Sequence, residues 1–578
     1  MRCWQLLLGW LLIVSTVLAD TDAIVIEGTK LFHSSNGTQF YIKGLLYDEW
    51  TGTRSGLSEV DFLSIRSACE RDVPVFQELG INTVGLYTVD AYANHDYCMD
   101  LLNDAGIYVV VFMNSLNTAS PNATNPTWNT DEFAEKSAIV DALAAYDNVL
   151  AFLLFDELPA EEDAPYSKAK VRDMKAYIAS KDYRAIPVGY GMYLHPSREE
   201  NVYLNCGDED DSVDFFALQT NAWCGDSLSE IGWDVYLEQF DGYSVPVIMA
   251  EYGCANSEEP GSEVSVLYGE EMTDVFSGGL LYVYAGAPEG LVNVSNQEVT
   301  RAPAFTSYSS QFAQASPTSI NSDTYSPTNT APSDCPSTFP TSLPPQPDEQ
   351  YCACTLQHSL CISVDEADDA LFTSLCAESD EICALHTSNG TLGVYGMYSM
   401  CNQTVEAAAL LSNYTQQEYG DSSESCAEAL SGASVMSNPE YTATGTCTKR
   451  AIYDGALPTA DTDTDSSGNG GNSDTASKSG LSAGAIAGIV VGAVTGVALA
   501  ILAFLLVRRR KRRDAAAGAD TGVQPVELPS GKHHDKHELP SGSIEVAELP
   551  GERPELDSGD PYDRTPAELP GEGRREAL

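Results

Sequence analysis

Eight short apolar runs between residues 41 and 284 constrain the fold of this chain more than any other feature. Each run has the length and the β-branched or aromatic content of a buried strand. Helical patterns lie between several of them, as at Asp131–Tyr146 and Ser167–Ser180. The strand-like runs are Tyr41–Tyr47, Thr83–Val89, Tyr108–Asn114, Val149–Leu158, Pro187–Met192, Asp214–Thr220, Pro246–Gly253 and Gly278–Tyr284. Eight strand-then-helix units predict an α/β fold, a (β/α)8 TIM barrel, whose catalytic groups follow the C-terminal ends of the strands.

Two of the eight runs end in a glutamate. The fourth run is followed by Asp156 and Glu157, and the seventh by Glu251. The ends of two such strands can face one substrate, and two carboxyl groups about 5–5.5 Å apart perform retaining glycoside chemistry. A single glutamate after a strand is more often a salt bridge or a loop cap. Two of them on separate strands of one barrel favour a nucleophile paired with an acid/base.

Two apolar segments, at residues 1–19 and 481–507, predict a protein that is exported and anchored in a membrane. Residues 1–19 combine Arg2, an apolar run and a small-residue end, which is typical of a cleaved signal peptide; the alternative is a short anchor. Residues 481–507 are apolar and uncharged, and the basic cluster Arg508–Arg513 follows. This predicts one transmembrane helix of a type I plasma-membrane protein, with its catalytic domain outside the cell.

Composition divides the rest of the chain into further segments. The predicted order is a catalytic domain at 20–312, a Pro/Ser/Thr linker at 313–350, a cysteine-rich module at 351–450, a flexible stalk at 451–480 and a disordered cytoplasmic tail at 508–578. Acceptor sequences for N-glycosylation all precede the predicted membrane helix, which supports the same orientation. They are at Asn36, Asn122, Asn293, Asn389, Asn402 and Asn413.

Charge and cysteine content exclude several classes of function. The net charge of −54 excludes a protein that wraps nucleic acid over a basic face. There are 15 cysteines, and the 14 that remain after signal cleavage can all pair, which makes a catalytic thiol a poor hypothesis. Glycines repeat every fourth residue from Gly484 to Gly496, which favours a helix-mediated homodimer, although glycine is common in membrane helices.

Several local motifs, in order along residues 24–300, resemble the fungal β-1,3-glucanosyltransferases, the Gas/Gel-type cell-wall enzymes of glycoside hydrolase family 72. The second module is similar to the family-43 carbohydrate-binding module, through Gly393–Gly396 and Tyr398–Cys401. The motifs that carry the first resemblance include Cys69–Pro74, Glu78–Thr83, Asn94–Met99, Val171–Ile178, Asn205–Asp208, Trp223–Gly225 and Glu251–Cys254.

The resemblance implies an enzyme that cleaves β-1,3-glucan and transfers the new reducing end to another glucan chain during fungal cell-wall assembly. Glu251 would be the nucleophile and Glu157 the acid/base, and the mechanism requires no metal and no organic cofactor. The implied disulfides are Cys69–Cys98, Cys224–Cys254 and Cys206–Cys335. The implied substrate-binding residues are Tyr87, Asn114, Asp156, Arg198, Trp223 and Tyr282, whereas Tyr47, Tyr252 and Tyr284 are aromatic candidates that barrel packing explains equally well.

Several positions depart from the family pattern. Asp156 replaces an asparagine that donates to the sugar, and an ionised aspartate can only accept hydrogen bonds. Gly85 replaces an arginine, while Asn221 and Ala285 replace aromatic residues, and Asp48 and Glu49 add acidic groups after the first strand. Two alternatives therefore stay open: a β-1,3-glucan hydrolase with eroded acceptor sites, or a glucan-binding wall protein without turnover.

Overall fold

The computed structural model describes most of the residues between 21 and 447. The described ranges are 21–51, 58, 60–113, 127–156, 163–193, 198–220, 224–254, 259–286, 288, 290–364, 369–427, 435–442 and 447. The predicted signal peptide, stalk, membrane helix and cytoplasmic tail lie outside these ranges. Among the described helices, none combines the length and the hydrophobicity needed to cross a membrane.

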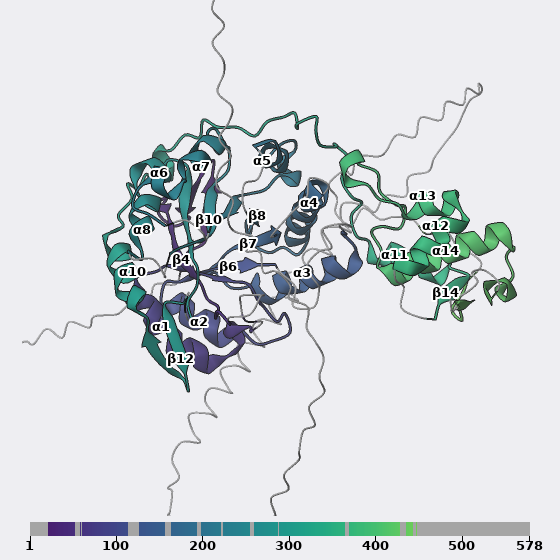
Figure 1. Ribbon diagram of the computed structural model, residues 1–578, viewed down its shortest axis with the longest axis horizontal. Helices are drawn as coiled ribbons and strands as arrows, with labels where there is room; N and C mark the ends of the chain where they lie inside the picture. Colours follow the sequence, from purple (N-terminus) through teal and green to yellow (C-terminus); the bar gives the residue numbers. More distant parts are fainter. Residues whose placement is uncertain are drawn as a thin grey trace, which may run out of the picture. The chain divides into compact units, whose positions relative to one another are not determined.

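A closed barrel of eight parallel strands forms the first domain, as the sequence predicts (Figure 1). The predicted strands differ from the observed ones by only a few residues at their ends. The fourth and seventh strands of the barrel are β7 and β10. The barrel strands are β4 (Ile42–Leu46), β5 (Thr83–Leu86), β6 (Tyr108–Phe112), β7 (Val149–Asp156), β8 (Val188–Tyr193), β9 (Phe216–Gln219), β10 (Val247–Tyr252) and β11 (Phe276–Leu281).

Helices surround the barrel and cover its outer surface (Figure 1). Local signals set their ends: the Asn129 side chain accepts from two backbone N–H groups at the start of α3, and Gly80 ends α1 in the left-handed conformation at φ 83°. The helices are α1 (Arg66–Leu79), α2 (Asp96–Asp104), α3 (Thr130–Leu143), α4 (Ala164–Ser180), α5 (Arg198–Leu204), α6 (Leu228–Ile231), α7 (Asp234–Gln239), α8 (Ser262–Leu267), α9 (Glu270–Thr273) and α10 (Pro303–Gln314).

Side chains alternate between two apolar cores. One fills the space between strands and helices, and the other fills the interior of the barrel. A small antiparallel sheet shares the interior core through Ile24, Leu31 and Phe40. Its strands are β1 (Ile24–Glu27), β2 (Lys30–His33) and β3 (Gln39–Phe40); a separate hairpin is formed by β12 (Val292–Ser295) and β13 (Glu298–Arg301).

The Pro/Ser/Thr segment packs against the barrel rather than hanging free. Cys335 is bonded to Cys206, the Phe339 ring stacks on Tyr203 with centroids 4.6 Å apart, and the Tyr203 hydroxyl donates to the carbonyl of Pro340 at 2.9 Å. The disulfide therefore fixes this segment to the surface of the first domain.

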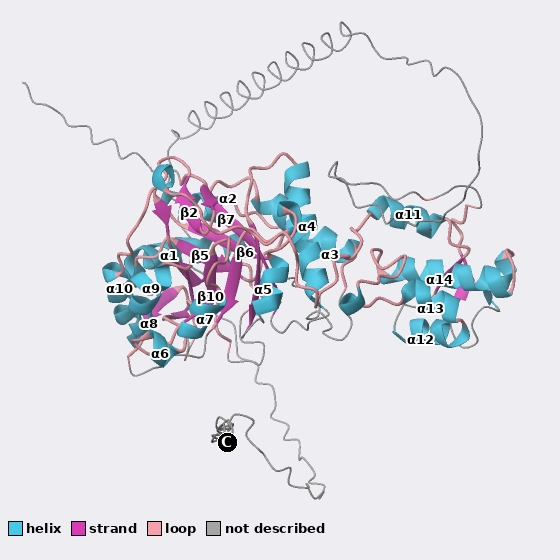
Figure 2. Cartoon of the chain, turned by 90° about the horizontal axis from the view of Figure 1, so that it is seen from above, coloured by secondary structure: helices cyan, strands magenta, loops and turns pink. Residues whose placement is uncertain are grey.

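The cysteine-rich module is mainly helical (Figure 2). Four disulfides link its eight cysteines, in the pairs Cys352–Cys401, Cys354–Cys447, Cys361–Cys426 and Cys376–Cys383. Such cross-links compensate for a small core. Its elements are α11 (Glu349–Gln357), β14 (Cys361–Ser363), α12 (Asp369–Glu378), α13 (Asp380–His386), α14 (Gln403–Glu418) and β15 (Val435–Ser437).

Candidate active site

A bulge in β10 turns Glu251 into the barrel. Leu218 of β9 pairs with Met249, and the next residue of β9, Gln219, pairs with Glu251, so Ala250 is an extra residue in β10. In strict alternation Glu251 would share the helix-facing side with Met249. The bulge instead points Glu251 inward, which is a common use of bulges beside active sites.

The Glu251 carboxylate is buried, and side-chain donors face both of its oxygens. Only 1% of the residue is exposed. Gln219 Nε2 donates to Glu251 Oε2 at 2.6 Å, and the Tyr87 hydroxyl donates to Oε1. Hydrogen bonds donated to a carboxylate favour its ionised form, which is the nucleophilic one.

Aromatic packing holds Tyr87 in place. Its ring stacks on Phe112 at the end of β6, with centroids 4.3 Å apart and planes at 26°, and it meets the edge of Phe155 from β7. Tyr87 is half-buried. Tyr87 therefore reaches Glu251 from the end of β5, three strands away around the barrel, and keeps part of its surface accessible.

Tyr282 lies beside the same strand end. Its backbone N–H donates to the carbonyl of Tyr252 at 2.8 Å, and its half-buried ring meets the edge of Trp50 with centroids 6.3 Å apart. Tyr87 and Tyr282 are therefore the two sequence-predicted contact residues whose side chains are described at this end of the barrel.

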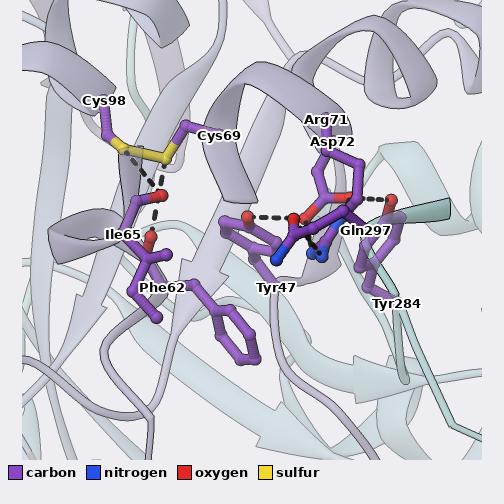
Figure 3. Close-up of polar contacts among 9 residues, drawn as sticks. All are labelled: Tyr47, Phe62, Ile65, Cys69, Arg71, Asp72, Cys98, Tyr284 and Gln297. Atoms are coloured by element: carbon purple, nitrogen blue, oxygen red, sulfur yellow. Dashed lines mark hydrogen bonds and ion pairs between the residues drawn. A yellow bond between two sulfur atoms is a disulfide. The ribbon is translucent and has the colours of Figure 1, made fainter. Parts of the chain in front are cut away.

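The other aromatic candidates belong to the packing between barrel and helices. Tyr47, Tyr252 and Tyr284 are at most 2% exposed. Figure 3 shows Tyr47 and Tyr284 on either side of Asp72 from α1, to which both hydroxyls donate, at 2.8 and 2.6 Å. Arg71 also donates to this carboxylate. These tyrosines do not line the site.

Asp48 forms a second buried carboxylate near the same end, after β4. Its Oδ1 accepts from the Ser58 hydroxyl and from the Glu49 N–H, each at 2.6 Å. Burial raises the pKa of Asp48 to about 6, although these hydrogen bonds oppose the rise. The group thus changes charge in the mildly acidic range.

Not every predicted site residue is described. The described residues do not include Glu157, Asn114 or Trp223. The predicted glycosylation site Asn122 also lies outside them. Asp156 ends β7 and Arg198 begins α5, but only their backbone is described. Gln219 is a site residue that the sequence analysis did not include, although it follows an apolar run just as the two glutamates do.

Gly85, where the resemblance implies an arginine, lies against filled space. A Cβ atom at this position would stand 2.7 Å from Leu280 Cδ1, 2.9 Å from Leu46 Cδ2 and 3.2 Å from Phe112 Cε2. The interior core therefore occupies the volume that a longer side chain would need.

Disulfides link the chain near the site in the three pairs that the resemblance implies. They join Cys69 to Cys98, Cys206 to Cys335 and Cys224 to Cys254. The last pair connects the segments that follow β9 and β10, the strands that carry Gln219 and Glu251. It restrains the two strand ends that form the site.

The cysteine-rich module contains a cavity of about 210 Å³ with an aromatic and polar lining. Tyr351 and Tyr398 supply aromatic surface, while Asn413 and Gln416 supply amides. Asn413 Nδ2 donates to the carbonyl of Ala409 at 2.8 Å and faces the Tyr398 hydroxyl at 3.4 Å. Aromatic rings beside amides are a combination that suits a sugar ring and its hydroxyl groups.

His358 lies at the edge of this cavity beside a disulfide. Its Nδ1 is 3.6 Å from the sulfur atoms of both Cys354 and Cys447. The grouping has the composition of a metal site, but the two sulfur atoms are bonded to each other and so are not thiolate ligands.

Comparison with known proteins gives the same picture of the two domains. A family model described as glucanosyltransferase matches residues 13–316, and an X8 domain model matches residues 353–432. A 1,3-beta-glucanosyltransferase of Arthroderma benhamiae is 34% identical over 510 residues, which cover 82% of this chain and 93% of that protein. The 1,3-beta-glucanosyltransferase gas1 of Schizosaccharomyces pombe is 36% identical over 457 residues, covering 75% and 82%.

Solved structures agree with these matches. Saccharomyces cerevisiae Gas2p in complex with laminaritriose and laminaritetraose is similar with a TM-score of 0.65 and 31% identity, over 73% of this chain and 99% of that one.

Proposed function

Because this chain belongs to the glucanosyltransferase family, glycoside hydrolase family 72, we propose that Glu251 is the nucleophile with which it remodels β-1,3-glucan. The chain is a β-1,3-glucanosyltransferase of the fungal cell wall: it cleaves one glucan and joins the new reducing end to another. The observation that carries the role of Glu251 is its buried carboxylate, turned inward by a bulge and held by Tyr87 and Gln219.

The reaction proceeds in two displacement steps. Glu251 attacks the anomeric carbon, the glycosidic bond breaks, and the leaving oxygen takes a proton from Glu157. Glu157 then accepts a proton from the hydroxyl of an incoming glucan, which displaces Glu251 and restores the ionised carboxylate. For Glu157, the support is its place directly after β7: Phe155 belongs to the interior core, and strand alternation predicts the same side for the residue two positions later.

Tyr87 and Tyr282 offer the aromatic surface that stacks on sugar rings. From the family resemblance we add four residues to the proposed substrate-binding set: Asp156, Arg198, Asn114 and Trp223.

Product analysis decides between transfer and its alternatives. Reduced laminari-oligosaccharides give longer products by transfer, only shorter ones by hydrolysis, and unchanged material if the protein only binds glucan. Glu251→Gln keeps the size of the side chain and should abolish longer and shorter products alike; persistence of either would remove Glu251 from the nucleophile role.

We propose that the cavity of the second module binds a β-1,3-glucan segment. Its aromatic rings and amides, together with the X8 match, support this role. Asn413, which lines the cavity, is also a predicted glycosylation site. A glycan on Nδ2 would fill the cavity, so we propose that the glucan-binding form carries no glycan at Asn413. Glycopeptide mass spectrometry of the wall-bound protein tests this.

We further propose a single-pass plasma-membrane protein with a signal peptide at 1–19 and a membrane helix at 481–507, whose glycines favour a homodimer. The apolar run, the basic cluster after it and the positions of the glycosylation sites support the orientation. The exposed side chains of Asn36, Asn293 and Asn389 are compatible with glycans. Protease protection of the tail in sealed vesicles tests the topology.

A further inference from the structure

Gln219 is placed by the fold directly against the nucleophile. It is the last residue of β9, its cross-strand partner is Glu251, and its Nε2 lies 2.6 Å from Glu251 Oε2. Gln219 is 9% exposed. A hydrogen bond that short to a buried carboxylate is charge-assisted and directional.

The orientation of the Gln219 amide is set by this contact. Its Oε1 is buried and has no hydrogen-bond partner among the described residues. If the amide were turned over, Oε1 would face Glu251 Oε2, and two acceptors would meet. The NH2 group of Gln219 is therefore the part of its side chain that faces Glu251.

Gln219 donates to Oε2 of Glu251, and Tyr87 donates to Oε1. The Gln219 amide is uncharged and does not titrate in the physiological range, so it donates a hydrogen bond at every pH in that range. A carboxylic acid at this position would donate only while it is protonated. A carboxylate at this position would instead repel Glu251.

We infer that Gln219 is a positioning residue that keeps Glu251 ionised and aimed at the anomeric carbon. The inference rests on the proposed role of Glu251 as the nucleophile. Before attack, the Gln219 N–H favours the charged form of the carboxylate. After attack, the oxygen that it contacts belongs to the glycosyl ester and can still accept the hydrogen bond, so the same contact serves both displacement steps.

The test uses the pH dependence of kcat/KM on reduced laminari-oligosaccharides, measured with the full-length protein. Gln219→Leu removes the donor, so Glu251 binds its proton more tightly. The acid limb should move to higher pH by about one unit, which is roughly a tenfold loss on that limb and a smaller loss above it.

Gln219→Glu should give the opposite signature. The carboxyl group introduced by this substitution can donate as the amide does while it is protonated, but once ionised it repels Glu251, so activity should fall on the alkaline side. Met249→Leu is the control, because Met249 lies on the same strand as Glu251 and packs in the outer core. It should keep the shape of the wild-type profile.

The outcomes separate this inference from the proposed function. If Glu251→Gln stays active, the nucleophile assignment fails. If Glu251→Gln is inactive while both Gln219 variants lose activity equally at every pH, Gln219 is only a packing residue and the inference is wrong. Should Gln219→Leu fail to fold, as judged by circular dichroism, the alkaline loss in Gln219→Glu decides alone.

Discussion

The hydroxyl group of Tyr284 donates to Asp72 Oδ1 at 2.6 Å and so joins the end of the last barrel strand to the first helix, across 212 positions of the chain. Asp72 is fully buried, and Tyr47 donates to its other oxygen. Burial raises the pKa of both tyrosines well above the usual value, so both hydroxyls remain donors at physiological pH. One carboxylate of α1 therefore links the segments that follow the first and last barrel strands.

Asp72→Ala should lower the free energy of unfolding by about 3–5 kcal/mol, because it leaves two buried hydroxyls and the Arg71 guanidinium without their shared acceptor. Denaturant titration measures the loss. Glu70→Gln is the matched control on the same helix, since Glu70 pairs with Arg66 at the exposed surface. Equal midpoints for the two variants would contradict a structural role for the buried cluster.

Asp48 should make stability depend on pH in a definite direction. Its folded pKa of about 6 lies above the unfolded value of about 3.9, so its stabilising contribution is complete below pH 4 and is lost as pH rises through 6. Asp48→Asn keeps an acceptor oxygen for Ser58 but cannot ionise. The variant should therefore gain about 2–3 kcal/mol relative to wild type between pH 4 and pH 7. A difference that stays constant over this range would argue against the buried charge.

The disulfide between Cys206 and Cys335 should contribute more to the free energy of unfolding than the disulfide between Cys376 and Cys383 in the cysteine-rich module. Its cysteines are 129 residues apart, whereas Cys376 and Cys383 are 7 apart. Loop-closure entropy predicts losses of about 5 and about 2 kcal/mol when each pair is changed to serine. Limited proteolysis within 315–345 should become faster only in the first double variant. The reverse order would show that the packing of this segment does not depend on its disulfide.

Tyr398→Ala should weaken retention on insoluble β-1,3-glucan by roughly tenfold, which corresponds to about 1.4 kcal/mol. The measurement is made in the Glu251→Gln background so that the glucan is not consumed. Tyr419→Ala is the control, because Tyr419 belongs to the same module but is exposed and does not line the cavity. Equal retention of the two variants would place glucan binding elsewhere.

The barrel could be predicted from sequence because its signal is local and repeated. Each buried strand appears as an apolar run, and the observed strands fall within those runs apart from one or two residues at an end. Glu251 was predicted because it ends such a run. The side to which it points could not be predicted, since simple alternation gives the wrong face and only the unpaired Ala250 corrects it.

Contacts that depend on the register between two strands could not be predicted from the sequence either. Gln219 faces Glu251 because β9 and β10 are aligned with one residue skipped, and no pattern in either run encodes that skip. The same limit applies to the aromatic candidates for sugar binding. Tyr47 and Tyr284 follow strands as Tyr87 does, but hydrogen bonds to Asp72 of α1 hold them in the core between barrel and helices.

Gly85 shows how closely the barrel interior is filled. Leu46 Cδ2 and Leu280 Cδ1 lie within 3 Å of where a Cβ atom would stand at this position. Any side chain placed here would require the ends of both leucines to move, so glycine is the residue that fits the interior as it is packed.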